Sequence, residues 1–252
     1  MKTAALGTLL SLLLAAVYAS AVPAADVPGY VLKAVADPNR PQDDRKLDGS
    51  RKPAEVLAFS GVKPGETVAE FLPGGGYYTR LLSDVVGPKG KVYALETTTW
   101  GQDNIAATKA VLSEPGHENV ALDLAPLGTF HLPVKADLFW TSLNYHDLHV
   151  PKYANVDMAA INKLVFASLK PGGSYFIVDH AAQPGTAATA SPTLHRIDKT
   201  TVIEEVTAAG FRLVGESDAL HSASDDHTLK VFDPKVRWKT DQFILKFTKP
   251  GP

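Results

Sequence analysis

The chain has 252 residues, of which 45% are hydrophobic and 21% charged, and its formal net charge is −2. This composition is typical of a globular protein with enough chain for one sizeable core. The near-neutral charge, with lysine and arginine spread along the chain, gives no reason to expect nucleic acid as a partner. Because there is no cysteine, disulfides, thiolate metal sites and lipids attached to cysteine are excluded.

The N-terminus has the pattern of a secretory signal peptide. Lys2 precedes an apolar run over residues 6–17, and Ala19-Ser20-Ala21 then forms a small-x-small cleavage pattern. A buried first helix or a membrane anchor are the alternatives, but the run is shorter than the ~20 residues that a membrane span needs. We predict a signal peptide over residues 1–21, cleaved after Ala21 or Ala25. The mature protein is then exported, to a bacterial periplasm or as a secreted protein, and has no membrane attachment.

Residues 22–52 are predicted to form an extension that precedes the main domain. A short helix is expected over residues 30–36, and the prolines within residues 37–44 indicate a turn-rich linker. A helix over residues 53–59 then opens the main domain, which we expect to run to residue 252.

The main domain is organised around a glycine-rich turn at Gly74, Gly75 and Gly76. The apolar run that ends at Phe71 predicts a buried strand, and residues 77–86 have the apolar spacing of a helix. Strand, glycine turn and helix form the first unit of a doubly wound α/β domain. Glycine lets a nucleotide-like ligand approach the backbone closely, and the N–H groups that open the helix can face that ligand.

Carboxylates stand where such a ligand would need them. Glu70 lies inside the first strand, where a free carboxylate is otherwise unfavourable. Glu96 ends the next strand, 22 residues after Gly74, which is near the usual distance for a group that holds ribose hydroxyls. Asp123 lies near the end of a third strand. The spacing favours a ligand with a ribose, and an ordinary turn that binds nothing is the alternative.

Strands and helices alternate through the remaining sequence, which predicts a parallel sheet with helices on both faces. Helices are expected over residues 77–86, 102–113, 154–169 and 199–209, and strands over residues 91–96, 119–124, 136–143, 174–179, 211–217 and 242–248. Such a doubly wound sheet binds its ligand at the carboxyl ends of its strands.

The glycine turn resembles the first motif of class I S-adenosylmethionine-dependent methyltransferases, which runs acid-x-Gly-x-Gly-x-Gly. Glu70, Gly74 and Gly76 match it, and Leu72 stands where the first glycine is expected. An NAD-binding fingerprint would instead need a glycine at Thr79. The stretches NYHDLH, LKPGG, LHRID and DDHT resemble a group of bacterial exported predicted methyltransferases, and the likeness covers most of the mature chain.

The resemblance implies a Rossmann-like methyltransferase sheet, mostly parallel with a final antiparallel strand, and S-adenosyl-L-methionine as the cofactor. The residues that would bind the cofactor are Glu70, Gly74, Gly75, Gly76, Tyr77, Glu96 and Asp123. The implied activity is the transfer of a methyl group to a small-molecule acceptor, which the sequence does not identify.

Polar side chains follow the predicted fourth and fifth strands, where the methyl group would lie. The candidate catalytic residues are Asn144, Tyr145, His146 and Asp147 after one strand, and Asp179 and His180 after the next. Methyl transfer from a sulfonium needs alignment of the reacting groups more than acid–base help. If the acceptor is a hydroxyl, His146 or His180 could remove its proton, because imidazole titrates near neutral pH. Helix capping and hydrogen bonds within loops are the alternative roles.

Two other functions are compatible with the same sequence. A non-catalytic exported protein could keep the fold and bind a small ligand, because fold does not fix function. A metal-assisted enzyme could draw nitrogen and oxygen ligands from His146, Asp147, Asp179, His180, Asp226 and His227. No stretch has the i, i+4 spacing of a helical metal motif, so no metal ion is predicted.

Overall fold

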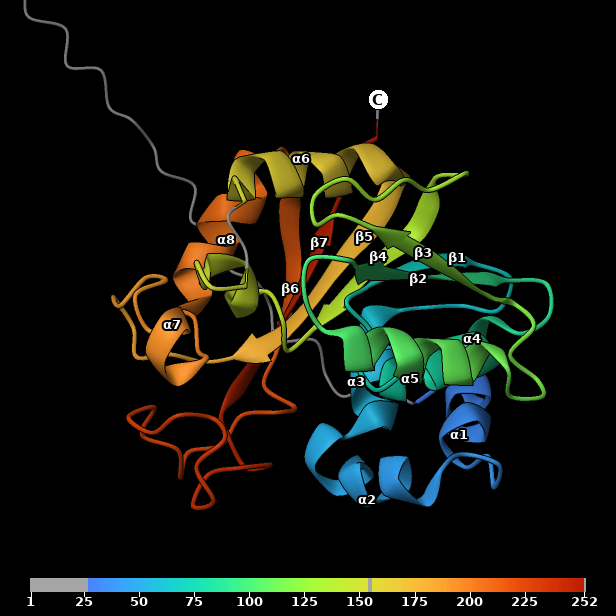
Figure 1. The fold of residues 1–252 in the computed structure, drawn as a ribbon, viewed down its shortest axis with the longest axis horizontal. Coiled ribbons are helices and arrows are strands. Elements are labelled where there is room, and N and C mark those ends of the chain that lie inside the picture. The colour runs from blue at the N-terminus through green and yellow to red at the C-terminus, as the bar shows by residue number, and fades with distance from the viewer. Residues whose placement is uncertain (1–26, 154–155, 252) are drawn as a thin grey trace, which may run out of the picture.

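A seven-stranded sheet runs through the protein in the order β3-β2-β1-β4-β5-β7-β6 (Figure 1). The computed structural model describes residues 27–153 and 156–251. The strands are β1 (Thr67–Phe71), β2 (Lys91–Thr97), β3 (Val120–Ala125), β4 (Ala136–Ser142), β5 (Leu169–His180), β6 (Arg212–Ser217) and β7 (Gln242–Thr248). β7 is antiparallel to both of its neighbours, and the other pairs are parallel. The predicted doubly wound sheet with a final antiparallel strand is confirmed.

The strand order reverses next to β1, and this reversal sets the place of a ligand. From β1 the chain moves outward through β2 and β3 and then returns to β4, which pairs with the other side of β1. In open α/β sheets, ligands bind at the carboxyl ends of the strands at such a point. Glu70 is in register with Trp140, and Phe71 with Thr141, so the turn after β1 and the loop after β4 are neighbours.

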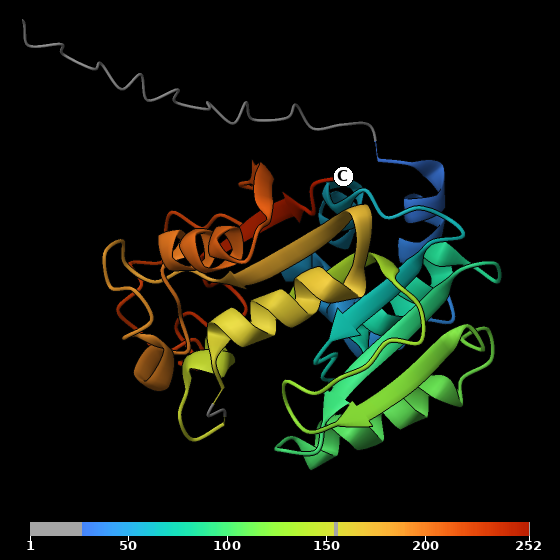
Figure 2. The same ribbon diagram turned by 90° about the horizontal axis from the view of Figure 1, so that it is seen from above.

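Helices cover both faces of the sheet, and each strand contributes side chains to both. The helices are α1 (Gly29–Val35), α2 (Gln42–Arg51), α3 (Pro53–Ser60), α4 (Tyr77–Val86), α5 (Gln102–Leu112), α6 (Met158–Ser168), α7 (Ser191–Leu194) and α8 (Lys199–Ala208), with a 3-10 turn η1 (His146–His149). One core joins α1, α3 and α4 to Leu138 and Trp140, and a second joins α6 and α8 to Phe139, because successive strand residues point to opposite faces. In Figure 2 the yellow helix α6 lies along β5.

Most predicted elements agree with the structure, and one strand begins earlier than predicted. β5 begins at Leu169, which pairs with Ala136 across a register shift, rather than at residue 174. The LKPGG stretch is therefore part of β5, in which Gly172 has a positive φ of 78°. The predicted signal peptide over residues 1–21 lies outside the described residues. Within the part of the chain that the structure describes, no helix is long and apolar enough to cross a membrane.

Residues 37–44 were predicted to be a turn-rich linker. Residues 37–41 do form turns and irregular backbone, but the prediction was wrong for residues 42–44, which begin helix α2. α2 buries none of its residues, so the sequence has no apolar periodicity that would have revealed it. Ion pairs hold the helix instead. Asp44 accepts a hydrogen bond from Arg80 of α4 at 3.1 Å, and Asp48 accepts one from the Tyr77 hydroxyl at 2.7 Å.

Arg40 and Asp48 form the most buried of these ion pairs. Arg40 is 3% exposed, and its guanidinium donates to both Asp48 carboxylate oxygens, at 2.7 and 2.9 Å, and to the carbonyl oxygen of Val35 at 2.7 Å. Such two-point pairs are geometrically specific. They fix α2 against α1 and the start of α4.

We predict that Asp48→Ala lowers the free energy of unfolding by about 2–4 kcal/mol, because it leaves the Arg40 guanidinium buried without its partner. Asp43→Ala on the same helix is the matched control, since the Asp43–Lys46 pair is exposed and its loss should change stability much less. Urea denaturation of both variants measures the difference. If both variants lost the same free energy of unfolding, the buried ion pair would not be what holds α2 in place.

Candidate functional site

The glycine turn after β1 passes through the left-handed region of backbone conformation. Leu72 (φ 55°), Gly74 (φ 61°) and Gly76 (φ 79°) all have positive φ. Leucine is uncommon in this region because its Cβ approaches the backbone, yet Leu72 adopts the conformation for which glycine is suited. At Gly76, which precedes α4, a Cβ atom would also lie 2.5 Å from Val111 Cγ2.

A cavity of about 260 Å³ lies beside this turn, and we call it the glycine-loop cavity. It lies at the carboxyl ends of β1 and β4, where the strand order reverses. The residues that line it are Asp44, Leu47, Arg51, Glu70, Phe71, Leu72, Pro73, Gly74, Gly75, Tyr77, Tyr78, Trp100, Asn104, Trp140, Ser142, Leu143, Asn144 and Asp147. A Cβ built on Gly74 or Gly75 would meet no atom within 4 Å, so the turn leaves room for a ligand against its backbone.

Four buried polar atoms in the wall of the glycine-loop cavity have no hydrogen-bond partner within the described structure. They are Glu70 Oε2, Arg51 Nε, Trp140 Nε1 and Ser142 Oγ. Buried polar atoms without partners are unfavourable. These atoms belong to an acidic, a basic and two neutral side chains. Their presence in one cavity wall indicates a site for a polar ligand with both positive and negative groups.

Glu70 is the most strongly perturbed acid of this cavity. It is 2% exposed, and burial raises its pKa to about 8, with the nearby Glu96 adding to the increase. The Thr79 hydroxyl, and then Arg51 and Arg80, act in the opposite direction. Glu70 is therefore mostly protonated at neutral pH in the unliganded protein, and a cation beside it would restore its charge.

The structure brings four of the seven predicted cofactor residues to the cavity, namely Glu70, Gly74, Gly75 and Tyr77. Glu96 lies behind the turn, where it accepts a hydrogen bond from the Thr108 hydroxyl at 2.9 Å. Burial raises the pKa of Glu96 to about 6, and Thr108 and the backbone N–H groups of Gly74 and Thr97 oppose that increase. Gly76 begins α4, outside the lining.

Asp123 lies on β3 opposite Leu95, next to Glu96 in the sheet, but outside the cavity. Its carboxylate accepts a hydrogen bond from the backbone N–H of His131 at 3.3 Å, and it does not line the cavity. Sequence reasoning also missed Arg51, Trp100 and Asn104. Arg51 belongs to α2, whose sequence carried no signal of contact with the site.

Asn144 and Tyr145 are held by the core, although both were candidate catalytic residues. The Asn144 amide donates to the carbonyl oxygens of Phe71 (3.2 Å) and Leu72 (2.9 Å), so it ties the loop after β4 to the glycine turn. Tyr145 is fully buried, and its hydroxyl donates to Glu205 at 2.7 Å. Tyr145 lines neither this cavity nor the one described next.

A second cavity, of about 420 Å³, adjoins the first, and we call it the histidine cavity. It is lined by Ser50, Arg51, Trp100, Leu143, His146, Asp147, Tyr153, His180, His195, Val231, Phe232, Arg237, Trp238 and Gln242. Arg51, Trp100, Leu143 and Asp147 line both cavities. A ligand in one cavity is therefore next to a ligand in the other.

The histidines of this cavity differ in charge. His146 Nδ1 lies 2.7 Å from Asp179 Oδ1. Burial lowers the pKa of His146, but the carboxylates of Asp179 and Asp147 outweigh burial and raise that pKa to about 10. Burial lowers the pKa of both His180 and His195. As an imidazolium, His146 cannot accept a proton, so this state does not support the general-base role expected from the sequence.

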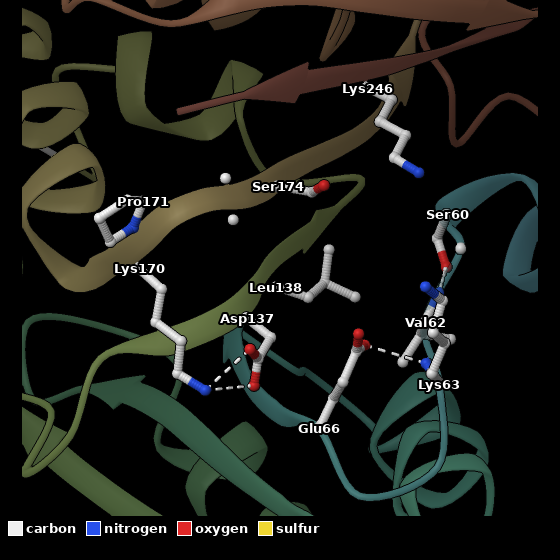
Figure 3. Close-up of a pocket in the computed structure, with 13 residues that line it drawn as sticks. Ser60, Val62, Lys63, Glu66, Asp137, Leu138, Lys170, Pro171, Ser174 and Lys246 are labelled. Atoms are coloured by element: carbon white, nitrogen blue, oxygen red, sulfur yellow. Dashed lines mark hydrogen bonds and ion pairs between the residues drawn. The ribbon is translucent and has the colours of Figure 1, made fainter. Parts of the chain in front are cut away.

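A third hollow, of about 280 Å³, lies near the amino ends of β1, β4 and β5. Figure 3 shows the residues that line it. Two of its acidic side chains already have partners. Lys170 Nζ lies 2.8 Å from both carboxylate oxygens of Asp137, and Glu66 accepts a hydrogen bond from the backbone N–H of Lys63 at 2.9 Å. Because doubly wound sheets bind ligands at the carboxyl ends of their strands, this hollow is not the candidate site.

Comparison with known proteins finds solved structures with the same fold. Neither family models nor curated proteins match the sequence. Among solved structures, a SAM-dependent methyltransferase from Aquifex aeolicus has a TM-score of 0.57 and 21% identity, covering 82% of this chain and 97% of that one. The glycopeptide N-methyltransferase MtfA, complexed with sinefungin, has a TM-score of 0.55 and 16% identity, covering 81% and 87%. The [4+2]-cyclase SpnF has a TM-score of 0.57 and 15% identity, covering 83% and 82%. The described residues thus have the fold of S-adenosylmethionine-dependent methyltransferases.

Proposed function

We propose that this protein is an S-adenosylmethionine-dependent methyltransferase that acts on a small-molecule acceptor. The observation that carries the proposal is the glycine-loop cavity at the reversal of strand order. There the Glu70 carboxyl and the Arg51 guanidinium each have a buried atom without a hydrogen-bond partner in the described structure. The neighbouring histidine cavity would hold the acceptor. The walls shared by the two cavities would bring the donor and acceptor groups together.

The chemistry of the cavity wall fits S-adenosylmethionine. This cofactor carries a carboxylate, an ammonium group and a sulfonium, and when bound it supplies an electrophilic methyl group. Arg51 would pair with the carboxylate and Glu70 with the ammonium group. The turn backbone at Gly74 and Gly75 leaves space for the nucleoside, and Glu96 is the proposed partner of the ribose hydroxyls.

The residues around the reacting groups would act by alignment and exclusion of water. Asn144 holds the loop after β4 against the glycine turn, so it is a positioning residue. Trp100, which lines both cavities, would close the space between them. During transfer the acceptor's lone pair forms the new bond to the methyl carbon, and the electron pair of the broken bond returns to sulfur as a neutral thioether.

Export to the periplasm or outside the cell belongs to the same proposal, supported by the leader pattern at residues 1–21. The mature protein from its native host is expected to begin at Val22 or Asp26. N-terminal sequencing determines the cleavage site, and a soluble protein that retains Met1 would contradict export.

Calorimetry with S-adenosylmethionine, followed by an assay for S-adenosylhomocysteine release with hydroxylated aromatics and small amines, tests the function. Binding together with acceptor-dependent release supports a methyltransferase. Binding without release for any acceptor supports a ligand-binding protein instead. No binding by the wild-type protein contradicts the methyltransferase and favours a protein that binds another small ligand.

We predict that Arg51→Gln weakens S-adenosylmethionine binding by about 1.5–3 kcal/mol, because it removes a charged partner of the carboxylate. Arg45→Gln is the matched control on the same helix, since Arg45 does not line the cavity. Calorimetry on both variants measures the two affinities. If both lose the same affinity, general electrostatic attraction rather than a specific pair accounts for the effect.

We predict that S-adenosylmethionine binding at pH 7 releases a proton from Glu70, because the ammonium group lowers a pKa that burial has raised to about 8. Calorimetry in buffers of different ionisation enthalpy measures the proton count. The release should approach one proton in the wild-type protein and vanish in Glu70→Gln. An identical proton count in the two proteins would contradict the placement of the ammonium group beside Glu70.

The same raised pKa predicts how stability changes with pH in the unliganded protein. Glu70 favours the folded state below its ordinary pKa of 4.5, and this contribution is lost as the pH rises toward 8. Glu70→Gln should therefore gain melting temperature relative to the wild-type protein as the pH rises from 5 to 8. A constant difference across that range would contradict the protonated state of Glu70.

A further inference from the structure

Three side chains of the histidine cavity bring one ligand atom each to a common point. Asp147 Oδ1 lies 3.2 Å from His146 Nε2 and 3.1 Å from His195 Nδ1, and the two ring nitrogens are 3.3 Å apart. Two ligand atoms that bind zinc tetrahedrally at 2.0–2.1 Å are about 3.3 Å apart, and octahedral ligation brings them to about 3 Å. We propose that His146, Asp147 and His195 bind a divalent first-row transition metal ion.

With Asp147 ionised, hydrogen bonds alone cannot satisfy this triangle of atoms. Each ring nitrogen is either a donor or an acceptor, and the ionised carboxylate is only an acceptor. If both nitrogens carry protons, the contact between His146 and His195 sets donor against donor. If either nitrogen lacks its proton, its contact with Asp147 sets acceptor against acceptor. A cation at the centre makes all three contacts favourable at once.

Asp179 orients one of the proposed ligands from behind. Its Oδ1 lies 2.7 Å from His146 Nδ1, and its Oδ2 accepts the backbone N–H of His146 at 2.8 Å. Asp179 is fully buried. A carboxylate on the far nitrogen of a histidine is the usual support of a metal ligand, because it fixes the ring and leaves the other nitrogen's lone pair for the metal.

Of the other candidate metal residues, His180 and His227 have polar partners outside this group. His180 Nδ1 lies 2.8 Å from the Thr240 hydroxyl, and His227 Nε2 lies 2.9 Å from Asp241. Among the described residues, His146, Asp147 and His195 form the group of histidine and acidic side chains whose ligand atoms all lie within 4.8 Å of one another. His195, which the sequence did not suggest, replaces the expected partners.

Three protein ligands leave positions of the ion free for a ligand in the cavity. The walls around the three ligands include the aromatic rings of Trp100, Tyr153 and Phe232, and Phe232 lies 5.0 Å from the His195 ring. The class of ligand that suits these surroundings is an aromatic compound with a hydroxyl group. Its hydroxyl oxygen would bind the ion and lose its proton more readily there. This statement about the acceptor rests on the proposed function, whereas the metal site does not.

The test uses chelator-treated full-length protein without S-adenosylmethionine. Calorimetry with Zn²⁺ should give one site, and Co²⁺ should give a visible absorption spectrum of a nitrogen- and oxygen-bound ion. Asp147→Asn and His195→Asn should weaken Zn²⁺ binding by ~100-fold or more, and Asp179→Asn by ~10–100-fold. Asparagine is chosen at position 195 because His195 has a φ of 55°, which asparagine tolerates.

His221→Ala is the matched control, because His221 pairs with Asp241 outside the proposed site and should keep wild-type affinity. Circular dichroism checks the fold of each variant. Wild-type affinity in both Asp147→Asn and His195→Asn, or no Zn²⁺ binding by the wild-type protein, would overturn the metal site. Zn²⁺ binding without S-adenosylmethionine binding would retain the site and remove the proposed function, and the reverse result would remove only the site.

A phenol added to the Co²⁺-loaded protein tests the free position. A shift of the Co²⁺ spectrum on addition of phenol or catechol, absent with cyclohexanol, supports the aromatic hydroxyl as ligand. No shift with either phenol or catechol would overturn that assignment.

Discussion

The buried carboxylate of Glu70 is the constraint on which the rest of the site depends. A sheet centre normally excludes such a group, since burial without a partner is costly. Here burial raises its pKa to about 8, and the turn that follows adopts positive φ even at Leu72. Both features are unfavourable for the unliganded fold. Both become favourable if a cationic ligand fills the space beside Gly74 and Gly75. Backbone strain and perturbed pKa values are common at functional sites for this reason.

The N-terminal extension completes this site. α2 has no apolar face, and its position depends on Arg40, Asp44 and Asp48, which pair with each other or with α4. Through that anchor, Arg51 reaches the boundary between the two cavities. The ion pairs that stabilise the extension therefore also hold the positive charge of Arg51 at the ligand site. Helix α2 therefore contributes both to the stability of the fold and to the proposed recognition of the ligand's carboxylate.

Much of the sheet could be predicted from the sequence, because apolar periodicity and glycine turns are local signals. Glu70 and the glycines were found for the same reason. Arg51 could not be predicted, because α2 forms through ion pairs that leave no periodic pattern. His195 joins His146 only through the tertiary fold, as they are 49 residues apart in the chain. The burial of Tyr145 could not be predicted, because its position after a strand does not reveal that its ring enters the core.

A crystal structure of the protein soaked with S-adenosylhomocysteine tests the central claim most directly. The account predicts the product in the glycine-loop cavity, with its carboxylate within hydrogen-bond distance of Arg51, its amino group beside Glu70 and its nucleoside against Gly74 and Gly75. Density for the product in the hollow of Figure 3, or an empty glycine-loop cavity at saturating ligand, would contradict the account.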